Sequence, residues 1–256
     1  MQETKRIDFR DQISKNKIVI ITLSIILLGL ILFLGFNTNH DTKKLTKYET
    51  EHFDIYYSGL EQETLNDIEY TLENTFNESG EFFGYINKSE VVVYSSNKEF
   101  QRNTYGLFVS LFLGDWAVGA AVEDKIFITS PENPDKSHSY EDMLEILSHE
   151  YVHTQIWKIS KDVNIWLDEG LATYFAGQKG NMTFSDVPSF EEINSNDIND
   201  FVNAEGYTFC YYYVEYLIDN YSKDEIIMLI KSNDYYNSLG KSKEEIYADW
   251  VKSLRE

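Results

Sequence analysis

Tyr140 to Ile159 reads YEDMLEILSHEYVHTQIWKI, and this stretch decides how the rest of the chain is interpreted. Its pattern predicts one helix, in which His149 and His153 stand four residues apart. Residues at that spacing share a helix face, so both imidazoles can reach a single metal ion. Glu150 lies beside them, where its carboxylate can accept a proton from water. The H-E-x-x-H pattern therefore predicts a metal centre; the alternative is a pair of core histidines on an amphipathic helix.

Two histidines do not complete such a centre, because a catalytic zinc takes three protein ligands and keeps a fourth position for water. One known pattern places a third histidine six residues after the second, but that position is Ile159 here. Ile156 stands where the same pattern needs glycine. The other common solution is a glutamate on the following helix. We expect that helix from residue 165 to about residue 178, with Glu169 of its WLDEGLA sequence as the third ligand.

Asp168 is the nearest competitor of Glu169 for this role. It points about 100° away around the helix, so Glu169 is favoured. Small side chains that share a face with Glu169 would let two helices approach closely: Ala172, Thr173 and Ala176. Gly170 costs roughly 1 kcal/mol of helix propensity relative to alanine. A close backbone approach at this position would explain its presence.

The combination of H-E-x-x-H at 149–153 with W-L-x-E-G-x-A at 166–172 resembles the gluzincins, especially the peptidase MA-like metallohydrolases related to aminopeptidase N. EHFDIYYS at 51–58, followed by a helix, is similar to that family's opening. WAVGAA at 116–121 is similar to the edge strand that lines its substrate cleft.

This resemblance implies a zincin-like domain that binds one Zn²⁺ ion and hydrolyses peptide bonds. The ligands would be His149, His153 and Glu169, and Glu150 would be the general base. Fifteen residues separate the second histidine from the glutamate, which indicates a minimal version of the fold. The Gly-Ala-Met-Glu-Asn motif that grips a free amine is not reproduced at 119–123, so the resemblance does not extend to aminopeptidase specificity.

Tyr207 begins a late helix, expected from 207 to 221, and resembles the tyrosine with which aminopeptidase relatives stabilise the oxyanion. Cys210 stands where the family's Y-x-x-G pattern has glycine. Three further tyrosines are fallback donors: Tyr211, Tyr212 and Tyr213. Cys210 is disfavoured as a nucleophile because no histidine follows it in the chain.

The N-terminal segment predicts a membrane anchor. Residues 18–36 carry no charge, and a helix of this length spans roughly 30 Å of hydrocarbon. A cleavable signal peptide is the alternative, but no small-residue cleavage site follows. Basic residues concentrate before the span, so residues 1–17 are expected in the cytoplasm and everything after the span outside the cell membrane. Residues 37–47 would form a polar stem before a domain at 48–256.

Charge and cysteine content exclude several classes of protein. Residues 1–44 carry seven Lys/Arg and four Asp/Glu, whereas the remainder carries 15 basic and 39 acidic residues. Such an acidic surface repels nucleic acid and anionic headgroups. It could favour cationic peptides or serve only solubility. A single cysteine forbids any internal disulfide.

Apolar patterning predicts an α+β fold with a small mixed sheet beside a helical lobe. Strands are expected at 51–58, 89–95 and 125–129, within a strand-rich part at 48–135 that also holds a helix after residue 60. The helical part, 136–256, contains the helices already named and a last one at 242–255.

These patterns favour a membrane-anchored zinc metallopeptidase that acts on a peptide or protein. The alternative is a displayed binding module that kept the fold and lost turnover. A calcium-binding surface protein is a third hypothesis, but no D-x-[DN]-x-[DN]-G loop occurs. The sequence leaves open the substrate, the choice between endo- and exopeptidase activity, and the oligomeric state.

Overall fold

The structure, a computed structural model, describes residues 42–84, 88–110, 114, 117–183 and 187–255. The predicted cytoplasmic segment and membrane span lie outside these residues, as do Trp116 and the first part of the expected stem. Within the described ranges, none of the helices combines the length and the apolar character that a membrane crossing requires.

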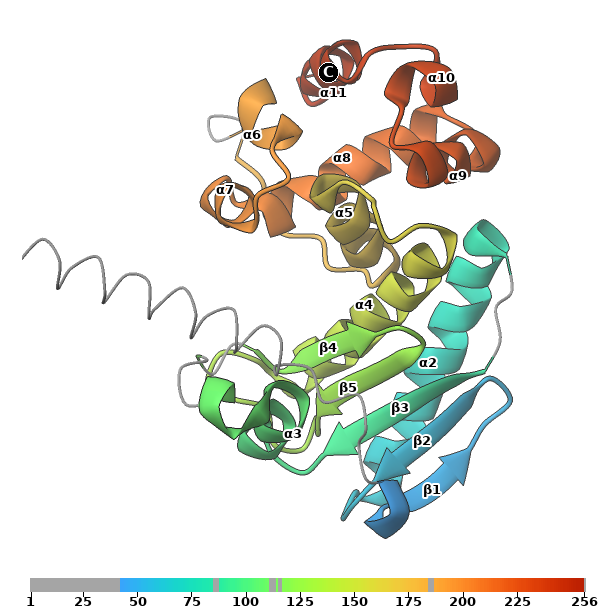
Figure 1. The fold of residues 1–256 in the computed structure, drawn as a ribbon, viewed down its shortest axis with the longest axis vertical. Helices are drawn as coiled ribbons and strands as arrows, with labels where there is room; N and C mark the ends of the chain where they lie inside the picture. The colour runs from blue at the N-terminus through green and yellow to red at the C-terminus, as the bar shows by residue number, and fades with distance from the viewer. Residues whose placement is uncertain (1–41, 85–87, 111–113, 115–116, 184–186, 256) are drawn as a thin grey trace, which may run out of the picture.

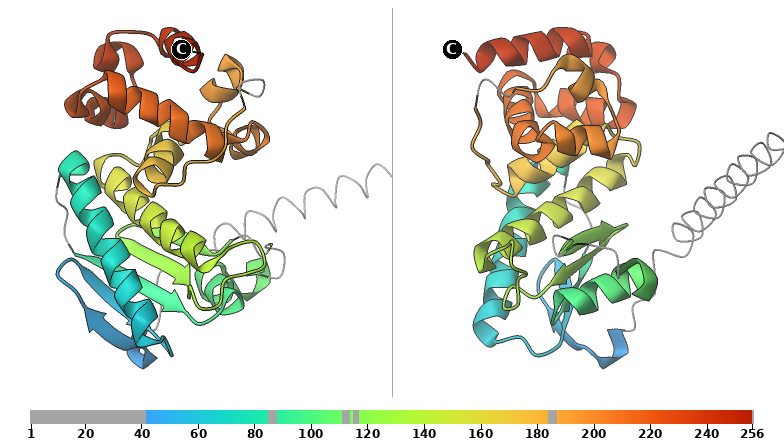
Figure 2. Two further views of the ribbon diagram at one scale, coloured as in Figure 1. Left: turned by 180° about the vertical axis from the view of Figure 1, so that it is seen from behind. Right: turned by 90° about the vertical axis from the view of Figure 1, so that its left-hand side faces the viewer.

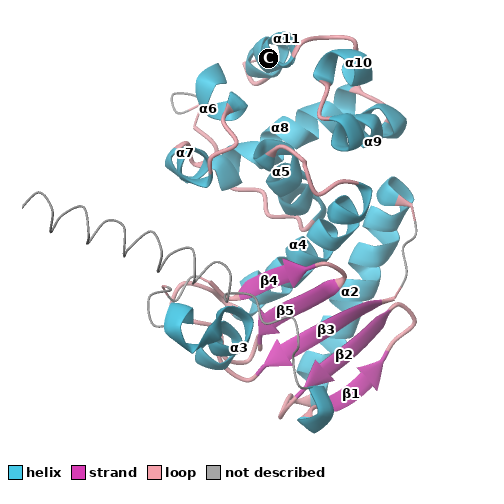
Figure 3. Cartoon of the chain, viewed as in Figure 1, coloured by secondary structure: helices cyan, strands magenta, loops and turns pink. Residues whose placement is uncertain are grey.

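A five-stranded mixed sheet occupies one half of the molecule, and Figure 3 shows the other half as helices joined by loops. The strand order across the sheet is β1 (Thr46–Glu49), β2 (Phe53–Tyr57), β3 (Ser89–Tyr94), β5 (Lys125–Thr129) and β4 (Gly119–Val122). The three inner strands run parallel, and both edge strands pair antiparallel with their neighbours. The expected α+β class and small mixed sheet are confirmed.

Alternation along the strands assigns each face of the sheet to different helices. Val91 and Val93 pack into one core with α2 (Gln62–Phe83) and α4 (Tyr140–Ile159). Val92 points the other way, into a second core with Phe100 of α3 (Asn97–Ser110). Successive side chains of a strand point to opposite faces, so one β-branched run serves both cores. Figures 1 and 2 show α3 on one side of the sheet, with α2 and α4 on the other.

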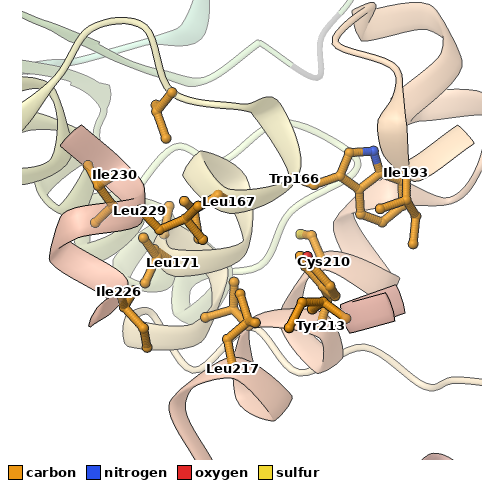
Figure 4. Close-up of a cluster of buried hydrophobic side chains, with 14 of the residues drawn as sticks. Trp166, Leu167, Leu171, Ile193, Cys210, Tyr213, Leu217, Ile226, Leu229 and Ile230 are labelled. Carbon is orange, nitrogen blue, oxygen red and sulfur yellow. The ribbon is translucent and has the colours of Figure 1, made fainter. Parts of the chain in front are cut away.

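The helical lobe is built around the packing of α5 (Ile165–Phe175) against α8 (Gly206–Asn220). The remaining elements surround this pair: α6 (Phe190–Asn194), α7 (Ile198–Asn203), α9 (Lys223–Ser232), α10 (Tyr235–Leu239) and α11 (Lys243–Ser253). Figure 4 shows the core around this pair, where Trp166 of α5 lies beside Ile193 of α6 and Leu171 of α5 faces Ile226 and Leu229 of α9. Val152 and Ile156 of α4 belong to the same core, which therefore packs α5 beside α4.

The predicted elements are present, with some differences in extent. The helix at 140–159 has the expected bounds, and the next one ends at Phe175 rather than near residue 178. The region 96–124, where the sequence analysis gave only a resemblance to an edge strand, also contains α3, which is kinked where Gly106 adopts a φ of 83°. Strand β1 begins at Thr46 and so includes the last two residues of the expected stem.

Candidate metal centre

Helix α4 begins with a capping box that fixes its register. The Ser139 side chain accepts from the backbone N–H of Asp142, whose carboxylate accepts from the Ser139 backbone N–H. Three turns later the helix presents His149 and His153, both buried. Their Nε2 atoms lie 3.0 Å apart. The predicted pair of imidazoles therefore converges on one point.

Helix α5 brings Glu169 to the same point. The Asn164 side chain caps this helix by accepting from Trp166 N, and α5 packs directly on α4. Glu169 Oε2 lies 3.2 Å from His149 Nε2 and 3.7 Å from His153 Nε2.

These distances fit a single small cation. The three ligand atoms all lie within 4.8 Å of one another. Atoms bound about 2.0–2.2 Å from one zinc in a tetrahedron are roughly 3.3 Å apart. Glu169 Oε2 is buried and, despite the nearby imidazole, makes no hydrogen bond of acceptable geometry within the described chain. A buried carboxylate oxygen without a partner is costly, and a bound cation would satisfy it. The group can therefore hold a metal ion.

Asp168 is not a member of the cluster but contacts one of its histidines. Its Oδ1 lies 2.8 Å from His153 Nδ1, and its Oδ2 accepts a hydrogen bond of 2.9 Å from Trp157 Nε1. The Trp157 ring stacks on that of His153, with ring centroids 5.1 Å apart. These contacts fix the ring so that Nε2 points to the centre.

Gln178 orients the ring of His149 in the same way, because Gln178 Oε1 lies 2.8 Å from His149 Nδ1. The sequence analysis missed Gln178 and Trp157. Helical spacing from His153 would have found Trp157, which is four residues further along α4. Nothing in the sequence marks Gln178, which follows the end of α5 and reaches the centre through the path of the chain.

Glu150 faces the edge strand β4. A Cβ added to Gly119 would lie 3.1 Å from Glu150 Oε1 and 2.8 Å from Ile146 Cγ2, so only glycine leaves room there. The backbone N–H of Ala121 faces the Glu150 carboxylate and acts to lower its pKa. The base predicted from the sequence is thus held between α4 and the sheet edge.

Burial raises the pKa of Glu150, and the nearby carboxylate of Glu169 adds to the rise. The two imidazoles oppose it. Burial also acts to lower the pKa of His153, but the carboxylate of Asp168 acts in the opposite direction. With smaller contributions from the two glutamates, the pKa of His153 rises to about 10. Burial acts to raise the pKa of Glu169, and the two imidazoles hold it below its usual value.

Tyr207, the first of the tyrosines predicted as oxyanion donors, lies within the electrostatic influence of the centre. Burial raises its pKa, and the charges of Glu169 and Glu150 raise it further, which places its hydroxyl end within their field. Tyr207 as a whole residue is nonetheless 49% exposed. Tyr105 of α3 was not selected in the sequence analysis. Burial and the charge of Glu150 together raise the pKa of Tyr105 to about 12.

The fallback donors are engaged elsewhere. Tyr212 donates to Gly180 O, and the buried Tyr213 donates to Tyr235 Oη. Tyr211 packs between Tyr174 and the ammonium of Lys179. Cys210 is buried against Thr173, and burial raises the pKa of its thiol, as expected of an inert cysteine.

Comparison with known proteins adds no family to this geometry: no family model matches the sequence, and no curated protein matches it.

Proposed function

We propose that this chain is a zinc-dependent metallopeptidase of the gluzincin type, with a zincin-like domain anchored to the cell membrane by residues 18–36. The observation that supports the proposal most strongly is the convergence of two imidazole nitrogens and one carboxylate oxygen, which all lie within 4.8 Å of one another. Two histidines and a glutamate form a ligand set that catalytic zinc sites use.

Zinc is favoured over harder cations by the donor atoms. Calcium and magnesium are bound mainly by oxygen, whereas two of the three donors here are imidazole nitrogens. Each imidazole is oriented by an oxygen acceptor on its far nitrogen, the arrangement typical of metal-binding histidines.

A zinc ion bound there would supply Lewis acidity, polarising a peptide carbonyl and lowering the pKa of water. Glu150 then accepts the proton of the attacking water and delivers it to the leaving amine, so that the C–N bond breaks with no net change in the enzyme. Burial prepares this carboxylate for the exchange by raising its pKa, which makes it a better proton acceptor. Tyr207 donates a hydrogen bond to the oxygen on which negative charge develops.

Metal analysis of the full-length protein tests the ligand set. We expect one zinc per chain, lost in His153→Ala and kept in His138→Ala, a histidine that lies outside the centre and pairs with Asp135. Equal zinc in both variants would contradict the assignment.

Glu150→Gln separates an enzyme from a binding module. The variant should keep zinc and lose roughly 10²–10⁴-fold in the hydrolysis of a mixed peptide library. A wild-type protein that binds zinc but cleaves nothing would favour the binding module, which keeps the fold without turnover.

A further inference from the structure

Exposed apolar side chains gather on and beside α7. Of the large apolar side chains that are exposed in the described part of the chain, three fall between residues 198 and 207: Ile198 at 49%, Val202 at 54% and Tyr207 at 49%. Ile198 and Val202 stand four residues apart and share one face of the helix, here called the α7 face. Phe201 is buried against Trp166, so the α7 face points away from the core. Single exposed apolar residues need no explanation, but such a gathering is typical of an interaction site.

Tyr207 connects this surface to the metal centre. Its ring packs edge-on against that of Phe201, with ring centroids 5.0 Å apart. Its hydroxyl end lies within the field of Glu169 and Glu150. Figure 1 shows α7 and the start of α8 together at one end of the helical lobe, with α9 and α10 at the other end. A peptide bound on the α7 face therefore needs only to extend past Tyr207 to reach the metal centre.

The chain around the α7 face is acidic. Residues 180–222 contain eight acidic residues and no lysine, arginine or histidine. Asp197 caps α7 and Asp200 lies in its first turn. Their carboxylates accept hydrogen bonds from the uncharged side chains of Asn199 and Ser195. The backbone N–H of Asn199 lowers the pKa of Asp197, so this carboxylate is ionised at neutral pH. The α7 face thus combines apolar side chains with uncompensated negative charge from its own stretch of chain.

This combination selects one kind of occupant. Bulky apolar side chains gain free energy when they leave water for the α7 face. Basic side chains next to them are attracted by the surrounding carboxylates, which also repel acidic chains. Nucleic acid and anionic lipid are repelled by the same charge. A peptide segment that interleaves basic and bulky apolar residues satisfies both properties of the surface.

We propose that the α7 face is an exosite, a docking surface outside the metal centre, that binds a cationic amphipathic segment of the peptide substrate. This inference rests on the proposed peptidase function. It narrows the substrate class to peptides that carry basic and bulky apolar residues apart from the cleaved bond. Ile198 and Val202 supply the apolar contacts, and Asp197 and Asp200 supply complementary charge.

Binding to full-length, zinc-loaded Glu150→Gln protein tests the exosite without turnover. Three labelled peptides of equal length share one pattern and combine Lys with Leu, Glu with Leu, or Lys with Ser. In fluorescence anisotropy the Lys/Leu peptide should bind about tenfold more tightly than either of the others. Its affinity should fall as salt is raised, because exposed charges are screened. Equal binding of all three peptides would overturn the exosite.

Substitutions on the α7 face should remove the contribution of leucine. Ile198→Ser combined with Val202→Ser should bind the Lys/Leu and Lys/Ser peptides equally, and leucine at both positions should restore the preference. Both side chains are exposed, and serine has roughly the helix propensity of isoleucine and valine, so the variant should fold. Met228→Ser, at an exposed methionine of α9, is the matched control and should bind as the wild type does. An equal loss in the control would overturn the exosite.

Charge is tested separately. Asp197→Asn combined with Asp200→Asn should weaken binding of the Lys/Leu peptide and reduce its salt dependence, while asparagine preserves the helix cap. Asp224→Asn, in the first turn of α9, is the matched control and should change neither. An equal effect of both changes would mean that the peptide responds only to overall charge, which would overturn the exosite.

Turnover distinguishes failure of the exosite from failure of the peptidase function. A cleavable quenched peptide with a Lys/Leu extension should exceed its Lys/Ser counterpart about tenfold in kcat/KM. The serine double variant should lose this advantage through KM, with kcat unchanged. Cleavage that ignores the extension would overturn the exosite and leave the peptidase function standing. No cleavage, together with selective binding that depends on Ile198 and Val202, would overturn the peptidase function and support the docking surface. Dimerisation that the serine double variant abolishes, without peptide binding, would overturn the exosite by assigning the α7 face to a second copy of the chain.

Discussion

Asp168 Oδ1 lies 2.8 Å from Nδ1 of His153, so the residue that competes with Glu169 in the sequence contacts a member of the candidate metal cluster instead of joining it. The two acidic neighbours diverge because they point in different directions around α5. Glu169 reaches the far nitrogens of both rings, and Asp168 reaches the outer side of one of them.

Removal of this partner should weaken the metal site without emptying it. Asp168→Asn should lower zinc affinity by about 10- to 100-fold, because the amide is a poorer acceptor for the imidazole N–H. Competition with a chromogenic chelator measures the change. Asp162→Asn, in the exposed loop before α5, is the matched control and should bind zinc as the wild type does. Unchanged affinity in Asp168→Asn would show that the contact does not support the ligand.

Gly170 should resist replacement despite the helix propensity that alanine would add. A Cβ there would lie 2.4 Å from Val214 Cγ2 and 2.7 Å from the backbone oxygen of Cys210, so α5 and α8 would have to separate. We expect Gly170→Ala to lower the free energy of unfolding by about 1–3 kcal/mol in urea titrations. Gly180→Ala meets only the side chain of Thr208 at 3.1 Å and should cost less. A neutral Gly170→Ala would mean that the two helices adjust freely.

Lys243 should make stability rise with pH in the alkaline range. Burial lowers the pKa of Lys243 from its usual 10.5 to about 8. Between these values the unfolded chain keeps the proton that the folded chain has lost, so the unfolding free energy increases with pH and the penalty for a buried charge is relieved. Below pH 8 both states are protonated and the penalty is present in full.

Lys243→Met should therefore stabilise the protein at pH 7, with a gain that shrinks as pH rises through 8 toward 10.5. Urea titrations at a series of pH values measure it, and Lys231→Met at an exposed position of α9 is the control. A gain independent of pH would refute the electrostatic cause, since neither Ile193 O nor Tyr235, whose pKa burial raises to about 12, titrates in that window.

Glu73, on the sheet side of the molecule, should stabilise the folded state at neutral pH and cease to do so in acid. Burial acts to raise its pKa, but hydrogen bonds from Thr50 Oγ1 and from the backbone and ring of His52 outweigh burial and lower the pKa. Because the folded pKa lies below the unfolded one, the stabilisation is complete above the unfolded value of about 4.3. It is lost as pH falls through the folded pKa.

Glu73→Gln should accordingly lower the midpoint of urea unfolding at pH 7 and have little effect at pH 2. The exposed Glu81 provides the control, and Glu81→Gln should change neither value. An equal loss at both pH values would assign the effect to packing instead of charge.

The sequence determined the chemistry of the proposed centre because that chemistry is local. A spacing of four residues puts His149 and His153 on one face wherever a helix forms, and α4 spans the expected residues because its start is fixed by Ser139 and by Asp142 three residues on. Apolar periodicity likewise predicted β2, β3 and β5. The sequence did not predict α3, whose Gly106 and polar residues interrupt any period.

Only the tertiary structure decided which groups support the centre. Gln178, Gly119 and Ala121 meet α4 through long excursions of the chain, and no short-range pattern records such contacts. The same holds for the tyrosines, where hydrogen bonds to distant elements occupy Tyr212 and Tyr213 and leave Tyr207 beside the two glutamates. Local spacing sets which side chains share a helix face, but the packing of α4 against α5 and β4 sets what that face meets.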